Sequence, residues 1–511
     1  MTMFSKTNYT DGCQCPKMLW MQRNMPEWYE EDAASQNLLE GGNEVGELAR
    51  EWAGDHVLIE QDYDFERMAK MTREALAEGK TVCEATFTDG ERVCMVDICK
   101  PNRDKTIDVL EVKASTKVKP YHIQDLAFQI SVCESAGFEV SRASIVHLNS
   151  DYRLDGELDL DLLFLVEDCT AQAHGAAEGI DDAIAGFREV RDSSVEPDIA
   201  IGKHCNSPHA CPYQKWCWRD VPENSVFSLA SMGKVKGFKY WSAGFKTFEH
   251  LLREWCEPDE QQRKLLGVDG KVKLNDLQKA QAEGRAHIDA ASISKFLEKI
   301  HFPLYFLDFE TIQPAVPIFQ GTKPYQQVPT QYSLHWIDEA GGELHHAEYL
   351  APSTGDPRRG VAESLVEAIP SGACVTAYNM SFEKGRIKEL AGYFEEMHDD
   401  LMAIHDSIVD LMVPFRSGCV YFPAMGGSYS IKKVLPALFP DDPELDYRSL
   451  EGVHNGAEAI QAFMALSGMS AEDEARTRER LLRYCELDTL AMVRVWEWLV
   501  AHSEDAERAC A

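Results

Sequence analysis

An apolar run that ends in two alternate carboxylates is the feature that most constrains the fold of this chain. Residues 304–307 read Leu-Tyr-Phe-Leu, and Asp308 and Glu310 follow with one residue between them. An unbroken apolar run is typical of a central strand with both faces covered. On a strand, residues i and i+2 face the same side, so the two carboxylates should converge. We therefore predict a buried sheet with paired carboxylates at the end of one strand, although a lone Asp-x-Glu is often only a strand end.

Two later segments supply residues of matching chemistry. In 376–383 a small apolar strand end leads into Asn-Met-Ser-Phe-Glu, which opens a helix and ends in Glu383. Tyr484 and Asp488 lie four residues apart in a helical stretch and should share one helical face. Two Mg²⁺ or Mn²⁺ ions held by carboxylate oxygens can activate a water and stabilise a leaving oxygen. The three segments together predict metal-dependent hydrolysis of phosphodiester bonds.

On these motifs, residues 300–511 resemble the DnaQ-like DEDD exonucleases of the RNase H-like superfamily, in the tyrosine-type subgroup. The resemblance implies an RNase H-like α/β fold and 3′–5′ exonuclease activity. It implies that Mg²⁺ or Mn²⁺ is held by Asp308, Glu310, Glu383 and Asp488, and that Tyr484 orients the attacking water. The family's second motif normally ends in Asp, so Glu383 is a departure whose longer side chain could reach the metal or shift it. The alternative is a decayed, non-catalytic fold.

A second set of residues lies in the N-terminal half. Asp97 ends one predicted strand, and Glu111-Val-Lys113 lies in the next strand beyond a hairpin. On paired strands Asp97 and Glu111 can bind one metal, while Lys113, on the same strand face as Glu111, can position water or stabilise the transition state. An ordinary surface hairpin with alternating charge is the alternative.

Four cysteines flank this hairpin: Cys15 near the N-terminus, and Cys205, Cys211 and Cys217 beyond it. With the hairpin, they resemble the iron-sulfur subgroup of RecB-like PD-(D/E)XK nucleases over residues 1–225. The resemblance implies a restriction-endonuclease-like mixed sheet with catalytic Asp97, Glu111 and Lys113. It implies a 4Fe-4S cluster held by the four cysteines, which ties the ends of the domain together. Thiolates also suit Zn²⁺, and Cys13, His204 or His209 could substitute as ligands in such a site.

The N-terminal half departs from this family at one position. The relatives often have a metal-binding His on the first helix, where this chain has Gly46; Glu44 or Glu47 might substitute, and the sequence does not decide between them. The helix after the Glu-x-Lys strand brings Asp125 and Gln129 near the polar positions of the family's Gln-containing helix. A solvated helix face would explain these two residues equally well.

Length predicts the domain organisation. At about 150 residues per domain, 511 residues suggest about three units. We expect an α/β multidomain chain with a RecB-like domain at 1–225, a helical connector at 226–299 and a DnaQ-like domain at 300–511. No run of 18 apolar residues and no charged-then-apolar leader is present, so we expect no membrane span or secretory signal. The odd count of 15 cysteines fits a reducing compartment, and we expect a cytoplasmic protein.

The charge balance opposes nucleic-acid binding over most of the chain. The net charge is -34, from 51 Lys or Arg and 85 Asp or Glu, and such a surface repels phosphate backbones. The segment Val226–Ile300 differs, because its 13 Lys or Arg exceed its 10 Asp or Glu. A locally basic strip can bind nucleic acid where the global field does not, and an acidic proteome background would explain the excess of acid without functional meaning.

The sequence therefore predicts a nuclease that acts on nucleic acid, first of all DNA, in repair, recombination or defence, with a helicase or a repair or defence protein as a conceivable partner. The pairing of domains resembles uncharacterised bacterial proteins that fuse a RecB-like nuclease to a DnaQ-like exonuclease. One alternative keeps only the C-terminal exonuclease active, on DNA or RNA, with the N-terminal domain as an iron-sulfur binding platform. Another is a non-catalytic scaffold that uses both folds as docking surfaces.

Overall fold

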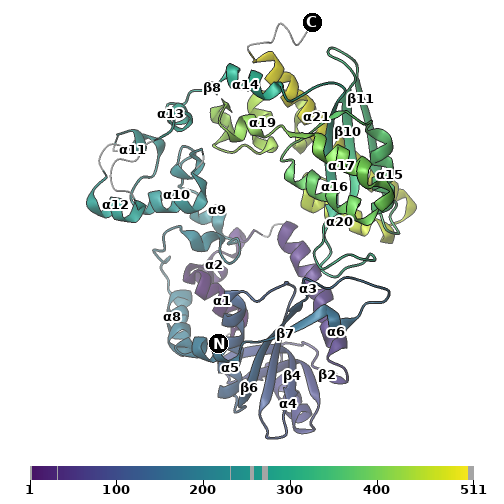
Figure 1. Cartoon of the computed structure of the whole chain (residues 1–511). Helices are drawn as coiled ribbons and strands as arrows, with labels where there is room; N and C mark the ends of the chain where they lie inside the picture. Colours follow the sequence, from purple (N-terminus) through teal and green to yellow (C-terminus); the bar gives the residue numbers. More distant parts are fainter. Residues whose placement is uncertain (1–2, 31–32, 231, 254–257, 268–273, 504–511) are drawn as a thin grey trace. The chain divides into compact units, whose positions relative to one another are not determined.

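The computed structural model describes residues 3–30, 33–230, 232–253, 258–267 and 274–503 (Figure 1). Its mixture of helices and several sheets confirms the predicted α/β class. The chain forms two compact units: Met1–Asp220 with Pro314–Gln326, and Val221–Gln313 with Gln327–Ala511. The segment predicted as a separate connector, 226–299, thus belongs to the second unit. A short piece of the predicted C-terminal domain, Pro314–Gln326, belongs to the first.

The first unit is built on a mixed sheet in the order β2-β3-β4-β5-β6-β7, with β1 pairing with β4. Antiparallel pairing joins β3 to β4, β4 to β5 and β6 to β7, whereas β5 and β6 are parallel. The strands are β1 (Phe4–Ser5), β2 (His56–Leu58), β3 (Thr81–Thr88), β4 (Arg92–Pro101), β5 (Ile107–Lys113), β6 (Val140–Leu148) and β7 (Phe164–Asp168). The hairpin expected between Asp97 and Glu111 is therefore β4 and β5.

Helices cover both faces of this sheet (Figure 1). The helices of this unit are α1 (Lys6–Gln14), α2 (Pro16–Asn24), α3 (Ala33–Trp52), α4 (Phe65–Ala77), α5 (Pro120–Ser135), α6 (Leu160–Leu163), α7 (Thr170–Ala177), α8 (Ile180–Asp192) and α9 (Gln214–Cys217). Successive residues of a strand point to opposite faces. Accordingly Val109 of β5 packs in the core that contains Phe128 of α5, while Leu110 packs on the other face with Val45 of α3.

The two ends of the first unit pack against each other. Helices α1 and α2 both contact α8. Gln14 Nε2 donates to the carbonyls of His204 and His209, at 2.8 and 2.9 Å, and Trp20 Nε1 donates to the carbonyl of Ser193 at 3.0 Å. Hydrogen bonds thus hold α1 and α2 to the segment 193–209.

The second unit contains a five-stranded sheet in the order β11-β10-β9-β12-β13. Its strands are β9 (Leu304–Ile312), β10 (Val328–Ile337), β11 (Leu344–Leu350), β12 (Cys374–Ala377) and β13 (Ile408–Asp410); β8 (His287–Ile288) and β14 (Val420–Tyr421) form a separate pair. Strands β9, β10 and β11 are antiparallel, and β12 is parallel to β9 and β13. The predicted central strand is β9, whose residues 304–307 are all buried.

The second unit also contains α-helices before, between and after these strands. They are α10 (Gly233–Ser242), α11 (Phe248–Arg253), α12 (Glu260–Leu266), α13 (Asp276–Ala282), α14 (Ala290–Leu297), α15 (Arg358–Ala368), α16 (Ser381–Tyr393), α17 (His398–Ser407), α18 (Val413–Arg416), α19 (Ile431–Leu438), α20 (Gly456–Ala465) and α21 (Ala471–Ala501). Leu307 packs with α15, α16 and α17, whereas Phe306 packs with the long helix α21. Asp308, two residues after Phe306, therefore faces α21. No helix among the described residues combines the length and apolarity needed to cross a bilayer.

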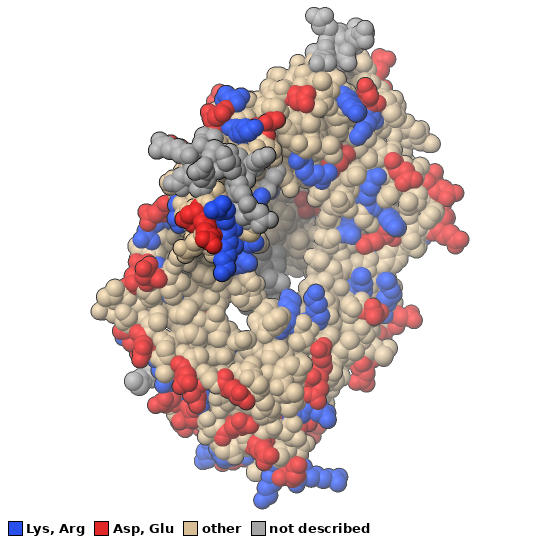
Figure 2. Space-filling model, turned by 60° about the vertical axis from the view of Figure 1, so that its left-hand side comes forward, with Lys and Arg blue, Asp and Glu red and all other residues tan. Residues whose placement is uncertain are grey.

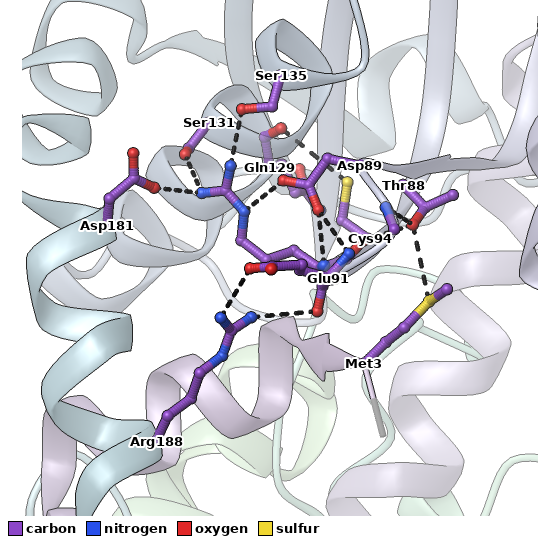
Figure 3. Close-up of polar contacts among 12 residues, drawn as sticks. Met3, Thr88, Asp89, Glu91, Cys94, Gln129, Ser131, Ser135, Asp181 and Arg188 are labelled. Atoms are coloured by element: carbon purple, nitrogen blue, oxygen red, sulfur yellow. Dashed lines mark hydrogen bonds and ion pairs between the residues drawn. The ribbon is translucent and has the colours of Figure 1, made fainter. Parts of the chain in front are cut away.

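A buried arginine ties the β3–β4 turn of the first unit to two helices (Figure 3). Arg92, at the start of β4, is only 8% exposed. Its Nε donates to Asp89 at 2.7 Å, and its two terminal nitrogens donate to Ser131 and Asp181 and to Ser135, at 2.8, 2.6 and 2.7 Å. Ser131 and Ser135 lie on α5 and Asp181 on α8, so one guanidinium joins three elements.

We expect Arg92→Leu to destabilise the first unit by about 2–4 kcal/mol, because Asp89 and two hydroxyls lose a buried charged donor. Arg188→Leu is the matched control, since Arg188 pairs with the exposed Glu91 (Figure 3) and should cost less than about 1 kcal/mol. Urea titration read by hydrogen exchange in peptides of β4 and α5 measures both. Equal losses in the two variants would contradict a holding role for Arg92.

Candidate metal sites

Three carboxylates converge on the α21 face of the C-terminal sheet. Asp308 and Glu310 extend from β9, and Asp488 extends from α21, which packs against β9. One oxygen from each carboxylate lies within 4.8 Å of the others. The strand-and-helix spacing read from the sequence thus brings these three predicted ligands together. Carboxylate oxygens in such a group are the donors that Mg²⁺ and Mn²⁺ prefer.

The pKa values of all three carboxylates are raised. Loss of hydration, and then the neighbouring Asp488, raise the pKa of Glu310 to about 8, although Lys432 opposes this. Loss of hydration raises the pKa of Asp488 to about 6, against the hydrogen bond from Tyr447. The pKa of Asp308 also lies well above its usual value, from loss of hydration and from Asp488. A divalent cation would offset this repulsion, so the residues fit the metal that the motif implies.

Glu383 lies beside this group rather than within it. It belongs to the first turn of α16, is 2% exposed, and is close enough to raise the pKa of Asp308. Burial raises its own pKa to about 8. Among the described residues, Glu383 Oε2 has no hydrogen-bond partner. The predicted fourth ligand is therefore a buried acceptor at the edge of the three-carboxylate group.

A lysine and a second tyrosine complete this site, and sequence reasoning missed both. Lys432 Nζ of α19 donates to the Tyr484 hydroxyl at 3.3 Å, and the Tyr447 hydroxyl donates to Asp488 Oδ1 at 2.6 Å. No spacing rule connects Lys432 or Tyr447 to Asp488, because the fold alone brings these residues to α21.

The N-terminal residues also come together. Asp97 of β4 accepts a hydrogen bond from the backbone of Val112 at 2.6 Å, and Lys113 Nζ donates to Glu111 Oε1 at 2.8 Å. Loss of hydration and the charge of Glu111 raise the pKa of Asp97 to about 7. Burial would raise the pKa of Glu111 as well, but Lys113 and Lys6 outweigh burial and lower it far below its usual value. One carboxylate of the pair is therefore held ionised.

Helix α5 and helix α1 enclose this group. Gln129 Nε2 donates to Glu111 Oε2 at 2.5 Å, and Asp125 forms an ion pair with Lys113. Both residues suggested by the Gln-containing helix thus lie at the site rather than on a solvated face. Lys6 of α1 donates to Glu111 Oε1 at 2.5 Å. Sequence reasoning missed Lys6, since it is far from the hairpin in sequence and no motif contains it.

Gly46, which stands where the resembling family often has a histidine, lies in a cleft of the first unit. Glu47, Arg50 and Glu84 line this cleft together with Asp97. Glu84 of β3 pairs with Arg50 at 3.3 Å and was not considered from the sequence. Of the two alternatives, Glu47 shares the cleft with Asp97; Glu44 is its neighbour, and its pKa is raised by loss of hydration and by Glu47.

The four predicted cysteines line a single cavity. Its walls include Cys15, Cys205, Cys211 and Cys217, and also His204. Loss of hydration and the nearby thiols raise the pKa of Cys211 to about 12, against a backbone hydrogen bond. Four sulfur donors around one cavity suit a 4Fe-4S cluster or Zn²⁺ by their chemistry, and either would deprotonate the thiols.

The other two candidate ligands lie elsewhere. Cys13 is exposed and close to Tyr9, and the His209 ring packs on the Tyr121 ring, with 5.0 Å between centroids. The cavity therefore favours the four-cysteine set, with His204 as the remaining substitute.

Part of the chain, most of it in the second unit, matches a family model. Residues 305–430 match a family described as "Domain of unknown function (DUF2779)", a stretch that contains Asp308, Glu310 and Glu383. The chain is also similar to two uncharacterised proteins: the MG366 homolog of Mycoplasma pneumoniae, 31% identical over 218 residues, and UU173 of Ureaplasma parvum, 27% identical over 231 residues. The alignments cover 39% and 40% of this chain, and 32% of each relative. The chain thus spans about a third of the length of these relatives.

We expect the metal-free second unit to lose stability as pH rises. The folded-state pKa of Glu310, about 8, lies above its ordinary 4.5, so the stabilisation from its protonated form is complete below pH 4.5 and is lost as pH rises through about 8. In EDTA, the thermal midpoint should fall across this window, and Glu310→Gln should reduce the fall. Glu472→Gln, at an exposed carboxylate, is the control. A wild-type midpoint that rises from pH 5 to 8 would contradict this sign.

We expect Cys205→Ser to lose the iron or zinc held in the cysteine cavity, because it removes one of the four sulfur ligands there. Cys13→Ser should keep wild-type metal content, since Cys13 lies outside the cavity. Anaerobic purification with metal analysis and visible absorption measures both, and a brown colour distinguishes a cluster from zinc. Equal metal content in wild type and Cys205→Ser would exclude this ligand set.

Proposed function

We propose that this chain is a metal-dependent nuclease that hydrolyses phosphodiester bonds in nucleic acid, with its 3′–5′ exonuclease site at Asp308, Glu310 and Asp488. The observation that carries the proposal is the convergence of these three carboxylates, within 4.8 Å, beside the Tyr484 hydroxyl. Mg²⁺ or Mn²⁺ held there, with Glu383 within reach as a further ligand, would supply a Lewis acid and an activated water.

The chain's own groups position and orient the reactants in this proposal. Loss of hydration and the charge of Asp488 raise the pKa of Tyr484 far above 10, so its phenol stays protonated and orients the attacking water without acting as a base. Tyr447 holds Asp488 in place through their 2.6 Å hydrogen bond. Lys432 provides a positive charge next to the carboxylates, where it can contact a non-bridging phosphate oxygen.

We further propose a second, RecB-like nuclease site at Asp97, Glu111 and Lys113, in a domain closed by a 4Fe-4S cluster on Cys15, Cys205, Cys211 and Cys217. The ion pair of Lys113 with Glu111 supports it. A specific observation also favours the alternative of a binding platform: Lys6 pairs with the same Glu111 oxygen at 2.5 Å, and a metal would have to compete with this ammonium. Repair, recombination or defence would suit either version.

Substrate binding in this proposal is local. Acidic and basic side chains are interspersed over the face seen in Figure 2, without one broad basic surface. The net charge of -34 would repel phosphate over most of the molecule, so affinity must come from a few lysines and arginines and fall with added salt. The basic segment Val226–Ile300 is the first candidate for this contact.

End-labelled single- and double-stranded DNA and RNA, incubated with Mg²⁺ or Mn²⁺, test the proposal. We expect Asp308→Asn to slow laddering from the 3′ end by at least about 100-fold, since loss even of groups that only orient a metal ligand costs up to that factor. Glu339→Gln, at an exposed carboxylate of the same unit, should cleave at the wild-type rate. Asp97→Asn with Lys113→Ala reports separately on the N-terminal site.

The outcomes separate the alternatives. If each variant removes a distinct product, both sites are catalytic. If only Asp308→Asn has an effect, the N-terminal domain is a binding platform. If wild type, purified anaerobically with its metal intact, cuts none of the substrates with either ion, the enzyme proposal fails and a scaffold takes its place.

A further inference from the structure

Two histidines and a glutamate form a separate group in the second unit. His335 of β10 and His346 of β11 are directly paired across the two strands, and Glu486 extends from α21. One nitrogen from each ring and one carboxylate oxygen lie within 4.8 Å of one another. The two ring centroids are 4.4 Å apart. His335 is 5% exposed, while the other two are half-buried.

Hydrogen bonds fix which nitrogen of each ring carries a proton. Thr489 Oγ1 is 3.1 Å from the carbonyl oxygen of Glu486 and must donate to it, because a carbonyl only accepts. Ser333 Oγ, 2.7 Å from Thr489 Oγ1, must then donate to Thr489. Both hydroxyl protons are thereby used. His335 Nδ1, at 2.8 Å from Thr489 Oγ1, and His346 Nε2, at 3.0 Å from Ser333 Oγ, must therefore be the donors.

This assignment gives each neutral ring a lone pair on its other nitrogen, Nε2 in His335 and Nδ1 in His346. A histidine that binds a metal commonly donates its second ring N–H to an oxygen, which fixes the tautomer and the orientation of the ring. Here Thr489 and Ser333 are those oxygens. Arg483 donates to Glu486 Oε2 at 2.7 Å, which orients that carboxylate in the same way.

We propose that His335, His346 and Glu486 bind a divalent transition metal ion, for which Zn²⁺ is the probe. Two imidazoles and one carboxylate are a known three-ligand set for zinc, with a fourth position open to water. Imidazole donors favour Zn²⁺ and its first-row neighbours over Mg²⁺ and Ca²⁺. The site would therefore differ in metal preference from the carboxylates at Asp308, Glu310 and Asp488.

The bound ion would cross-link three secondary-structure elements. It would connect β11, the edge strand, to β10 and to α21. Helix α21 also carries Tyr484 and Asp488, so metal at this site would restrain the helix that supplies half of the proposed exonuclease site. The binding itself does not depend on the proposed nuclease activity.

Zinc titration of the metal-stripped chain tests the proposal, with metal content measured after dialysis. We expect His346→Ala and Glu486→Gln each to hold one zinc ion fewer than wild type. His345→Ala is the matched control: His345 is the next residue of β11, but it stacks on Trp336 and pairs with Asp338 on the other face. It should retain wild-type zinc. The cysteine and carboxylate sites are unchanged in all of these variants, so the difference reports on this site alone.

Two further measurements guard against loss of folding. Thr489→Val keeps all three ligands but removes the acceptor of His335, and should weaken zinc binding about 10- to 100-fold. Zinc should also slow hydrogen exchange in β11 of wild type and of His345→Ala, but not of His346→Ala. If His346→Ala and Glu486→Gln, folded by near-UV circular dichroism, hold as much zinc as His345→Ala, the proposal is overturned. Loss of zinc from the control to the same extent would also overturn it.

Discussion

Crowding of like charges is the constraint on which the second unit depends. Three half-buried carboxylates lie within 4.8 Å of one another, and such a group opposes folding unless the scaffold around it is rigid. The apolar run 304–307 anchors β9 at the centre of its sheet, and α21 packs its apolar face against Phe306. Strand order, helix length and the hydrogen bond from Tyr447 all keep the carboxylates in place. The packing of β9 and α21 and the hydrogen bond from Tyr447 thus surround the three carboxylates.

The two units compensate the charge of their buried carboxylates in different ways. In the first, Glu111 is compensated from within the chain by Lys113 and Lys6, at 2.8 and 2.5 Å. In the second, Lys432 is the neighbouring cation that lowers the pKa values of Glu310 and Asp488, and both values remain raised. A cation from solution would therefore offset more uncompensated negative charge at the C-terminal carboxylates than at the N-terminal ones. The same residue types produce two electrostatic environments because Lys6 and Lys113 lie directly on Glu111, whereas Lys432 lies on a separate helix, α19.

Much of the arrangement could be predicted where residues are close in sequence. Alternation along β9 predicts that Asp308 and Glu310 share a face, and helical spacing predicts the pairing of Tyr484 with Asp488. The four cysteines could be grouped because their spacing resembles a known pattern, and they line one cavity. Lys6, Glu84, Lys432 and Tyr447 could not be found, because each is brought to its site by tertiary packing. The paired histidines at 335 and 346 were missed because the register of β10 and β11 is not encoded in any local motif.

The contact of α1 and α2 with α8 in the N-terminal unit has a consequence for how the chain is made. Helices α1 and α2 dock on α8, and Gln14 bonds to the backbone near residues 204 and 209. During synthesis, α1 and α2 therefore cannot dock until α8 and the backbone near residues 204 and 209 have left the ribosome. Closing so long a loop is slow, and the surface of α1 and α2 stays uncovered meanwhile. Docking of the opening helices therefore comes late in synthesis, and the piece Pro314–Gln326 of the same unit is made later still.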